Sequence, residues 1–328
     1  MSLAADAGAA RQISRLAWSN SLALLLIVVV AVFSIIRPDT YFTAANAQMI
    51  ASTNAVLAIL ALAAVPPLVA GQFDMSIGFQ LALAQSLCAG MIISGGVPPV
   101  LAAFIVLALG LLVGFVNGLL IARAGLNAFI ATLATGIVIE GFTQLYTGGS
   151  SIFGDMPAYF LGFGRAELWG APLALIYVLI VAAIMWAVYR YTDWGRQCFA
   201  VGGNPKAANL IGISVDRIVV HSYMAAGFLA ALAGVLSSSI LGSSNPNVGM
   251  NYLLPAFAAV FLGAAPAGPG RFNAWGTVIA VYSLAAGIAG LQQLGAAFYV
   301  EQFFNGGALL AAIALAKWMA GRALASQR

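Results

Sequence analysis

Long apolar runs, separated by short interruptions of Gly, Pro, Asn or charged residues, cover almost the whole chain. Most runs reach about 18 residues, the length a helix needs to cross a hydrocarbon core ~30 Å thick, whereas barrel strands would alternate over ~10 positions. The runs fall at residues 19–36, 49–70, 77–94, 99–121, 127–147, 171–190, 217–240, 253–265, 274–291 and 302–320. The pattern predicts an all-α, polytopic membrane protein with about ten transmembrane helices.

The first and the eighth runs depart from this simple pattern. The first resembles the apolar part of a signal peptide, with Ala45-Asn46-Ala47 as a cleavage site, but Arg37 to Asp39 separate the two, so we expect an uncleaved span. The eighth run, 253–265, is short and ends in the Gly- and Pro-rich "GAAPAGPGRF". We therefore expect it to be broken or partly re-entrant.

Composition and charge agree with a membrane location and also predict its orientation. Only 7% of the 328 residues are charged and 62% are hydrophobic, whereas roughly a quarter of a soluble domain is charged. With the N-terminus in the cytoplasm, ten spans return the C-terminus to the same side. The cytoplasmic side then holds Arg11, Arg15, Arg123, Arg190, Arg196, Lys206, Arg217, Arg271, Lys317, Arg322 and Arg328, and the external side Arg37 and Arg165. This asymmetry follows the positive-inside rule.

One transmembrane domain, residues 1–328, accounts for the chain, with cytoplasmic segments at 1–18 and 191–216. The second segment contains "GGNPKAANLIG". Asn204 is a good N-cap, Pro205 suits the first helical position and Gly212 can end a helix in the left-handed conformation. A helix over 206–211 is too short to be stable alone. Either it inserts Ala207, Leu210 and Ile211 into a groove on another protein, or it lies on the membrane surface.

Three polar residues in or beside the spans are candidates for a transport pathway or gate. Asp74 lies between spans two and three, where we favour a structural role in capping span three together with Ser76. Asn117 adjoins the last of three glycines spaced four apart in span four, a pattern typical of close helix packing, and favours an interhelical hydrogen bond. Glu140 lies ~20 Å inside span five, where a carboxylate needs a polar cavity or partner.

Several kinds of chemistry are not supported by the sequence. The lysines, Lys206 and Lys317, precede Ala and Trp, so the chain has no phosphate-binding loop for ATP. A single histidine, His221, excludes multi-histidine metal sites, and no metal site is expected. Cys88 and Cys198 are expected to be free thiols. Membrane lipid, rather than nucleic acid, is the expected surrounding for the basic residues.

Four stretches together resemble the permease subunits of monosaccharide ABC importers, the ribose, galactose and xylose type. They are "GQFDMSIG", "GFVNGLLIARAGLNAFIATLATGIVIEG", "WGRQCFAVGGNPKAANLIGISVDRI" and "GFLAALAGVLSS". The resemblance covers nearly the whole chain in order, and its most specific element is "VGGNPKAANLIGI".

The resemblance implies a type II ABC importer-like fold and a role in carrying a sugar across the bacterial inner membrane. It implies a second permease subunit, as a homodimer or a paralogous heterodimer, a cytoplasmic ABC ATPase that binds the ATP, and a periplasmic sugar-binding protein. The chain itself would catalyse no reaction and bind no cofactor. The ATPase-coupling helix of the family corresponds here to Asn204, Pro205, Lys206, Ala207, Leu210, Ile211 and Gly212.

Two loops depart from the family pattern. The loop before span three usually has Gly-Gly, where this chain has Gly71-Gln72, and the loop after span eight replaces several glycines with Ala and Pro. A branched-chain amino acid permease and an ion-coupled secondary transporter remain alternatives. The second would need no ATPase and would depend on a buried acid such as Glu140.

Overall fold

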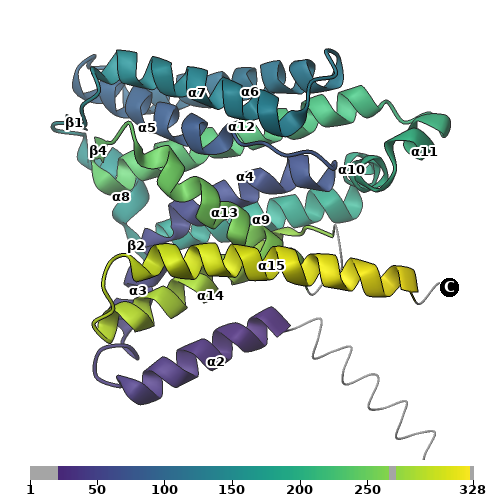
Figure 1. Cartoon of the computed structure of the whole chain (residues 1–328). Coiled ribbons are helices and arrows are strands. Elements are labelled where there is room, and N and C mark those ends of the chain that lie inside the picture. The colour runs from purple at the N-terminus through teal and green to yellow at the C-terminus, as the bar shows by residue number, and fades with distance from the viewer. Residues whose placement is uncertain (1–20, 266–270, 326–328) are drawn as a thin grey trace, which may run out of the picture.

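A computed structural model describes residues 21–265 and 271–325 as a bundle of helices (Figure 1). Beyond these ranges lie the expected cytoplasmic segment 1–18 and part of the loop after the eighth span. The helices are α2 (Ser21–Ile36), α3 (Ala44–Thr53), α4 (Ala55–Val69), α5 (Ile77–Ile93), α6 (Pro99–Ala122), α7 (Ala128–Thr147), α8 (Ala158–Arg165), α9 (Leu173–Tyr191), α10 (Asp193–Gly203), α11 (Pro205–Leu210), α12 (Val215–Leu241), α13 (Val248–Ala264), α14 (Ala274–Gln293) and α15 (Val300–Ala325).

Four two-residue strands complete the described elements. Strand β1 (Ile152–Phe153) pairs antiparallel with β4 (Ser243–Ser244), and β2 (Glu167–Leu168) pairs antiparallel with β3 (Ala171–Pro172). The strands lie at one end of the bundle, and α10 and α11 lie at the other, which we call the α11 end (Figure 1). Strand β4 follows α12 directly, so the β1–β4 pair connects the end of α12 to the segment before α8.

Helix α12 forms the centre of the bundle and packs against α6, α5 and α4. Its contact with α6 depends on glycine. A Cβ atom added at Gly110 would lie 2.5 Å from the carbonyl oxygen of Gly227, and one at Gly114 would overlap the carbonyl of Tyr223. The two backbones approach this closely because these positions have no side chain, which confirms the close packing predicted from the glycine spacing.

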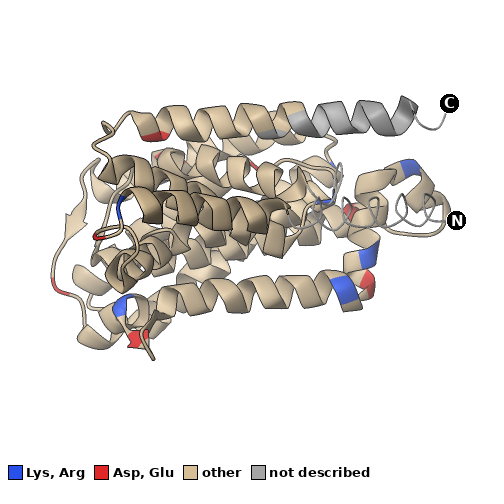
Figure 2. Ribbon diagram, turned by 90° about the horizontal axis from the view of Figure 1, so that it is seen from below, with Lys and Arg blue, Asp and Glu red and all other residues tan. Residues whose placement is uncertain are grey.

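The outer faces of α6, α7 and α9 expose large apolar side chains, which is the pattern of a surface in contact with lipid. Phe104 is 70% exposed, Ile130 67% and Ile184 58%. Five of the described helices are long and apolar enough to cross a membrane, and α3 with α4 makes a sixth if that pair, bent by 42°, is one span. Most coloured charged residues lie toward the two ends of the bundle (Figure 2). The chain is therefore a multi-pass membrane protein.

The helix boundaries follow the ten apolar runs, and α8 lies in the loop after the fifth run, where no helix was expected. There are three further differences. The second run is divided at Asn54 into α3 and α4. The eighth run forms one continuous helix, α13, which starts at Val248 and contains Pro255 in its interior. It is therefore not broken within the described residues. The polar segment after span six holds a further helix, α10, that the sequence pattern did not predict, because its residues are mostly polar or small.

Candidate functional site

The short helix α11 has the caps that the sequence predicted. The side chain of Asn204 accepts a hydrogen bond from the backbone nitrogen of Ala207 at 3.1 Å, and Pro205 occupies the first helical position. Gly212 follows the helix in the left-handed conformation, with φ +86°. The helix covers Pro205–Leu210, one residue earlier at each end than expected.

Helix α11 presents its largest apolar side chains to the outside. Leu210 is 88% exposed and Ile211 76% exposed, whereas Ala208 is 2% exposed and holds the helix against the protein. Lys206 and Ala207 are also exposed. Two large apolar side chains side by side, outside the apolar spans, form a surface that suits either a groove on another protein or the membrane surface.

Helix α10 fixes α11 to the bundle. Its residues Cys198 and Val201 are buried, and Gly202 lies against the last turn of α4, where an added Cβ would overlap the carbonyl oxygen of Val69. Burial raises the pKa of the Cys198 thiol to about 12, so this thiol stays protonated. Cys88 and Cys198 are both free, as predicted, and both are buried.

The connection between α4 and α5 contains a buried polar network centred on the Ser76 hydroxyl. This hydroxyl donates to Asp74 Oδ1 at 2.5 Å and accepts from Gln80 Nε2 at 2.8 Å and Asn117 Nδ2 at 2.9 Å. Asp74 Oδ1 also accepts from the backbone nitrogen of Ser76 at 2.9 Å. The structure therefore brings Asp74 and Asn117 together, and Asn117 makes the expected interhelical hydrogen bond.

Asp74 supports the start of α5, although Ser76 rather than Asp74 is the N-cap residue. Asp74 is 1% exposed, and burial raises its pKa to about 6, an effect that the hydrogen bonds from Ser76 offset only in part. Neighbouring groups hold the connection from other helices. Tyr223 of α12 donates to the carbonyl of Phe73 at 2.7 Å, and Thr132 of α7 accepts from the backbone nitrogen of Met75 at 2.9 Å.

We expect Asp74→Ala to destabilise the protein by about 1–3 kcal/mol, because it leaves the buried nitrogen and hydroxyl of Ser76 without an acceptor. Asp74→Asn keeps an oxygen at that position and should cost clearly less. Thermal unfolding of the purified variants in one detergent would measure both. Equal stability of Asp74→Ala and the wild type would contradict this structural role.

Glu140 is separate from this network. It is partly exposed on α7 and faces a shallow recess with Phe79, Asn247 and Met250. One turn further along α7, Gln144 donates to Asn247 Oδ1 at 2.7 Å. Glu140 thus lies beside the polar segment that precedes α13, and its role in the pathway stays a prediction.

A polar cleft of about 670 Å³ opens between α3, α13, α14 and α15. It lies in the half of the bundle away from the α11 end, because it involves the last turns of α14 and the first turns of α15. Its polar lining residues are Asn46, Thr53, Asn54, Asn251, Tyr252, Gln292, Gln293, Glu301 and Asn305. Gln292 donates to Glu301 Oε2 at 3.4 Å.

The sequence reasoning missed this cleft. Each amide residue lies near a helix end, where polar residues are common in membrane proteins and do not indicate a binding site. Only the fold brings the four helices together. Asn251 and Asn305 offer donors and acceptors without a formal charge, which suits a neutral polar solute. Among the described residues, no group of three or more His, Cys, Asp or Glu side chains could hold a metal ion.

An apolar membrane bundle with a capped helix at one end and a polar cleft toward the other is an arrangement that suits a transport permease. The chain matches the family model described as "Branched-chain amino acid transport system / permease component" over residues 46–313, and it belongs to this family. It is a transport subunit rather than a catalytic enzyme. No solved structure matches the chain significantly.

Three relatives align with this chain over most of the length of both sequences. The ribose import permease protein of Bacillus subtilis is 38% identical over 291 residues, 88% of this chain and 90% of the relative. The galactose/methyl galactoside import permease protein of Haemophilus influenzae is 31% identical, over 90% of this chain and 93% of the relative. The D-allose transport system permease protein of Escherichia coli is 31% identical, over 89% of each. These findings confirm the resemblance to monosaccharide importer permeases.

Proposed function

We propose that this chain is the membrane-spanning subunit of a binding-protein-dependent ABC importer, and that it carries a monosaccharide or a sugar-like solute. The observation that carries the proposal is the match to the ribose import permease along nearly the full length of both chains. The family description itself includes amino acid transport, but the three relatives are named for sugars. This pattern favours the sugar function over the branched-chain amino acid alternative.

The polar cleft between α3, α13, α14 and α15 forms one wall of the solute path in this proposal. A neutral sugar exchanges hydrogen bonds with water for hydrogen bonds with the protein, and Asn and Gln side chains supply both donors and acceptors. Weak, distributed contacts of this kind let the solute enter and leave. Asp74, Asn117 and Glu140 remain candidates for a gate rather than for this wall.

ATP hydrolysis in a partner subunit drives the transport step. The ATPase binds α11 through Leu210 and Ile211, and its closure moves the segment from Asn204 to Gly212 and so shifts the bundle between two access states. The α11 end then faces the cytoplasm, as do both termini, and the membrane is the bacterial inner membrane. ATP binds to the partner, so this chain needs no cofactor of its own.

Two further partners belong to this proposal. A second permease subunit, either a copy of this chain or a paralogue, provides the opposite wall, and a periplasmic sugar-binding protein delivers the solute. The connection from 148 to 172, with α8 and the β2–β3 hairpin, is the longest described connection at that end. The exposed Trp169 and Phe153 in it offer apolar contacts for such a protein.

Reconstitution into proteoliposomes with the ATPase and the binding protein of the same transport system tests the proposal. We expect ATP-dependent uptake of one of the labelled sugars ribose, galactose or allose, and no uptake of labelled leucine. Leucine uptake alone would support the amino acid alternative. Uptake that persists without the ATPase but depends on an ion gradient would support a secondary transporter.

We expect Asn251→Leu to reduce sugar uptake by roughly tenfold, because it removes about one hydrogen bond of approximately 1.4 kcal/mol from the cleft. Binding of the ATPase should not change. Gln302→Leu is the matched control, since Gln302 is exposed next to Glu301 but does not line the cleft. Equal uptake by wild type and Asn251→Leu would remove this residue from the path.

A further inference from the structure

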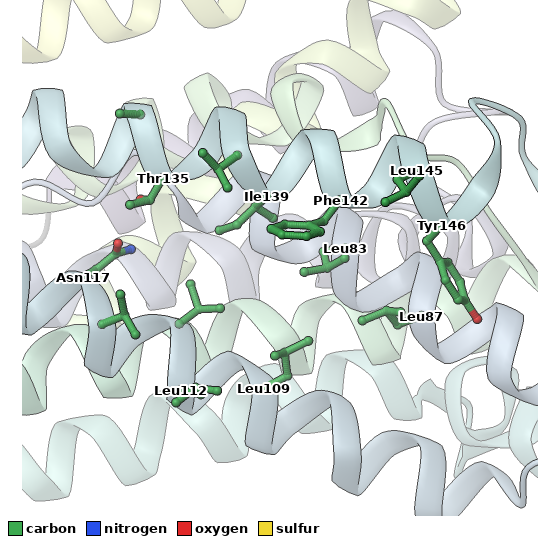
Figure 3. A pocket seen from close by; sticks show the side chains of 14 residues that line it. Leu83, Leu87, Leu109, Leu112, Asn117, Thr135, Ile139, Phe142, Leu145 and Tyr146 are labelled. Carbon is green, nitrogen blue, oxygen red and sulfur yellow. The ribbon is translucent and has the colours of Figure 1, made fainter.

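A long apolar groove runs between α6 and α7. The two helices follow each other in the chain, yet α6 packs mainly on α12 and α7 mainly on α5. The space between them is a groove of about 790 Å³ with Leu83 and Leu87 of α5 at its base (Figure 3). It is distinct from the polar cleft, which involves none of these helices.

The walls of the groove are apolar along its length, with polar groups only at its ends. Asn117 and Thr135 lie at one end and Tyr146 at the other, while Ile139 and Phe142 lie between them (Figure 3). The hydroxyl of Thr135 donates to the carbonyl of Thr132 at 3.1 Å, and the Asn117 amide nitrogen donates to Ser76. The middle of the groove thus offers no hydrogen bond to a sugar.

The groove lies on the face of the protein that contacts lipid. Leu112 is 56% exposed, Val138 58% and Leu145 79%, and all three line it. Tyr146 lies one residue before the last residue of α7, at the end of the bundle opposite α11. Tyrosine at the end of a membrane helix is typical of the headgroup level, so the groove starts there and extends into the membrane.

The length of the groove identifies its occupant. From Thr135 to Tyr146, α7 advances eleven residues, or ~16 Å, which is about one leaflet of a ~30 Å hydrocarbon core. A transmembrane helix of a second copy is ~30 Å long, so about half of it would lie outside this groove. One extended acyl chain needs only a single leaflet and an apolar lining.

We propose that this groove binds one acyl chain of a phospholipid from the leaflet away from the α11 end, with the headgroup beside Tyr146. The chain fills the space that α6 and α7 leave between them, so the bound lipid connects two helices that otherwise pack on different partners. The proposal does not depend on the transported solute, and its test needs no transport measurement.

Native mass spectrometry of protein extracted from nanodiscs of phosphatidylethanolamine and phosphatidylglycerol tests the site. Val138→Trp places a large side chain in the groove, and we expect about tenfold lower retention of phospholipid, the effect of displacing roughly two methylene groups. Ile137→Trp is the matched control, because Ile137 is also 58% exposed on α7 but does not line the groove. Wild type and control should each retain one phospholipid per chain.

Three results would overturn the proposal. Wild type could retain no phospholipid, or Val138→Trp could retain as much as wild type. A wild-type dimer that Val138→Trp separates into monomers would assign the groove to a second copy of the chain. If Val138→Trp does not yield a folded, monodisperse protein, Ala134→Leu fills the end of the groove away from Tyr146 with a smaller change and should give the same loss.

Discussion

Leu210→Asp is expected to abolish copurification of the partner ATPase and to remove substrate-stimulated ATP hydrolysis. Leu210 is the largest apolar side chain of α11 and is 88% exposed, so the substitution does not disturb the core of the permease. In the complex, the same residue would be buried in a groove of the ATPase. An unpaired charge buried there costs about 3–5 kcal/mol, which weakens binding by two to three orders of magnitude.

The measurement is affinity purification of the tagged permease from its native host in mild detergent, followed by ATPase assays in nanodiscs. Leu294→Asp is the control, because Leu294 is also exposed but lies between α14 and α15, away from the α11 end. Unchanged stimulated hydrolysis in Leu210→Asp would contradict the assignment of α11. If no ATPase copurifies with the wild-type permease, an ion-coupled secondary transporter becomes the leading alternative. Glu140→Gln is then the variant to test.

Gly114→Leu is expected to prevent normal folding of the bundle. A side chain at this position overlaps the backbone of Tyr223 in α12, and backbone cannot move aside as the end of a flexible side chain can. Helices α6 and α12 would have to separate, at a cost of about 3 kcal/mol or more. The yield of monodisperse protein and its thermal unfolding in detergent measure the effect.

Gly141→Leu is the matched control for this prediction. Gly141 also lies inside a long apolar helix, α7, but an added Cβ there meets no atom within 4 Å. This variant should fold like wild type and gain slightly in helix propensity. If both glycine variants lose stability equally, leucine at an interior helix position, rather than the α6–α12 contact, would explain the loss.

The spans and the caps of α11 could be predicted because both depend on local sequence. A helix formed by an apolar run is about as long as the hydrocarbon core is thick. Asn204, Pro205 and Gly212 favour the backbone conformations that start and end a short helix. The break at Asn54 was not predicted, because "STNA" interrupts an otherwise apolar stretch only weakly. Helix α10 was not predicted because it contains Gly195, Gly202 and Gly203, and glycine has a low helix propensity.

The site was only partly predictable, because it depends on tertiary contacts. The spacing of Gly110, Gly114 and Gly118 indicated a close helix contact but not its partner, α12. Asp74 and Asn117 were each recognised as unusual polar residues, yet nothing in the sequence indicated that both bond to Ser76. The cleft around Asn251 needs α3 from near the start of the chain and α13, α14 and α15 from its last third, and no local sequence pattern shows that they meet.

Helix α12 connects the α11 end of the molecule with the end that holds the polar cleft. It has 27 residues and is therefore about 40 Å long, and four residues separate its start from the end of α11. Its other end leads through β4 directly into α13, whose first turns line the polar cleft. A tilt of about 5° would displace that far end by about 3.5 Å over the length of a helix of this size. A small rotation imposed near Leu210 would thus be transmitted along α12 and, through the short connection with β4, would change the width of the cleft at the other end of the bundle.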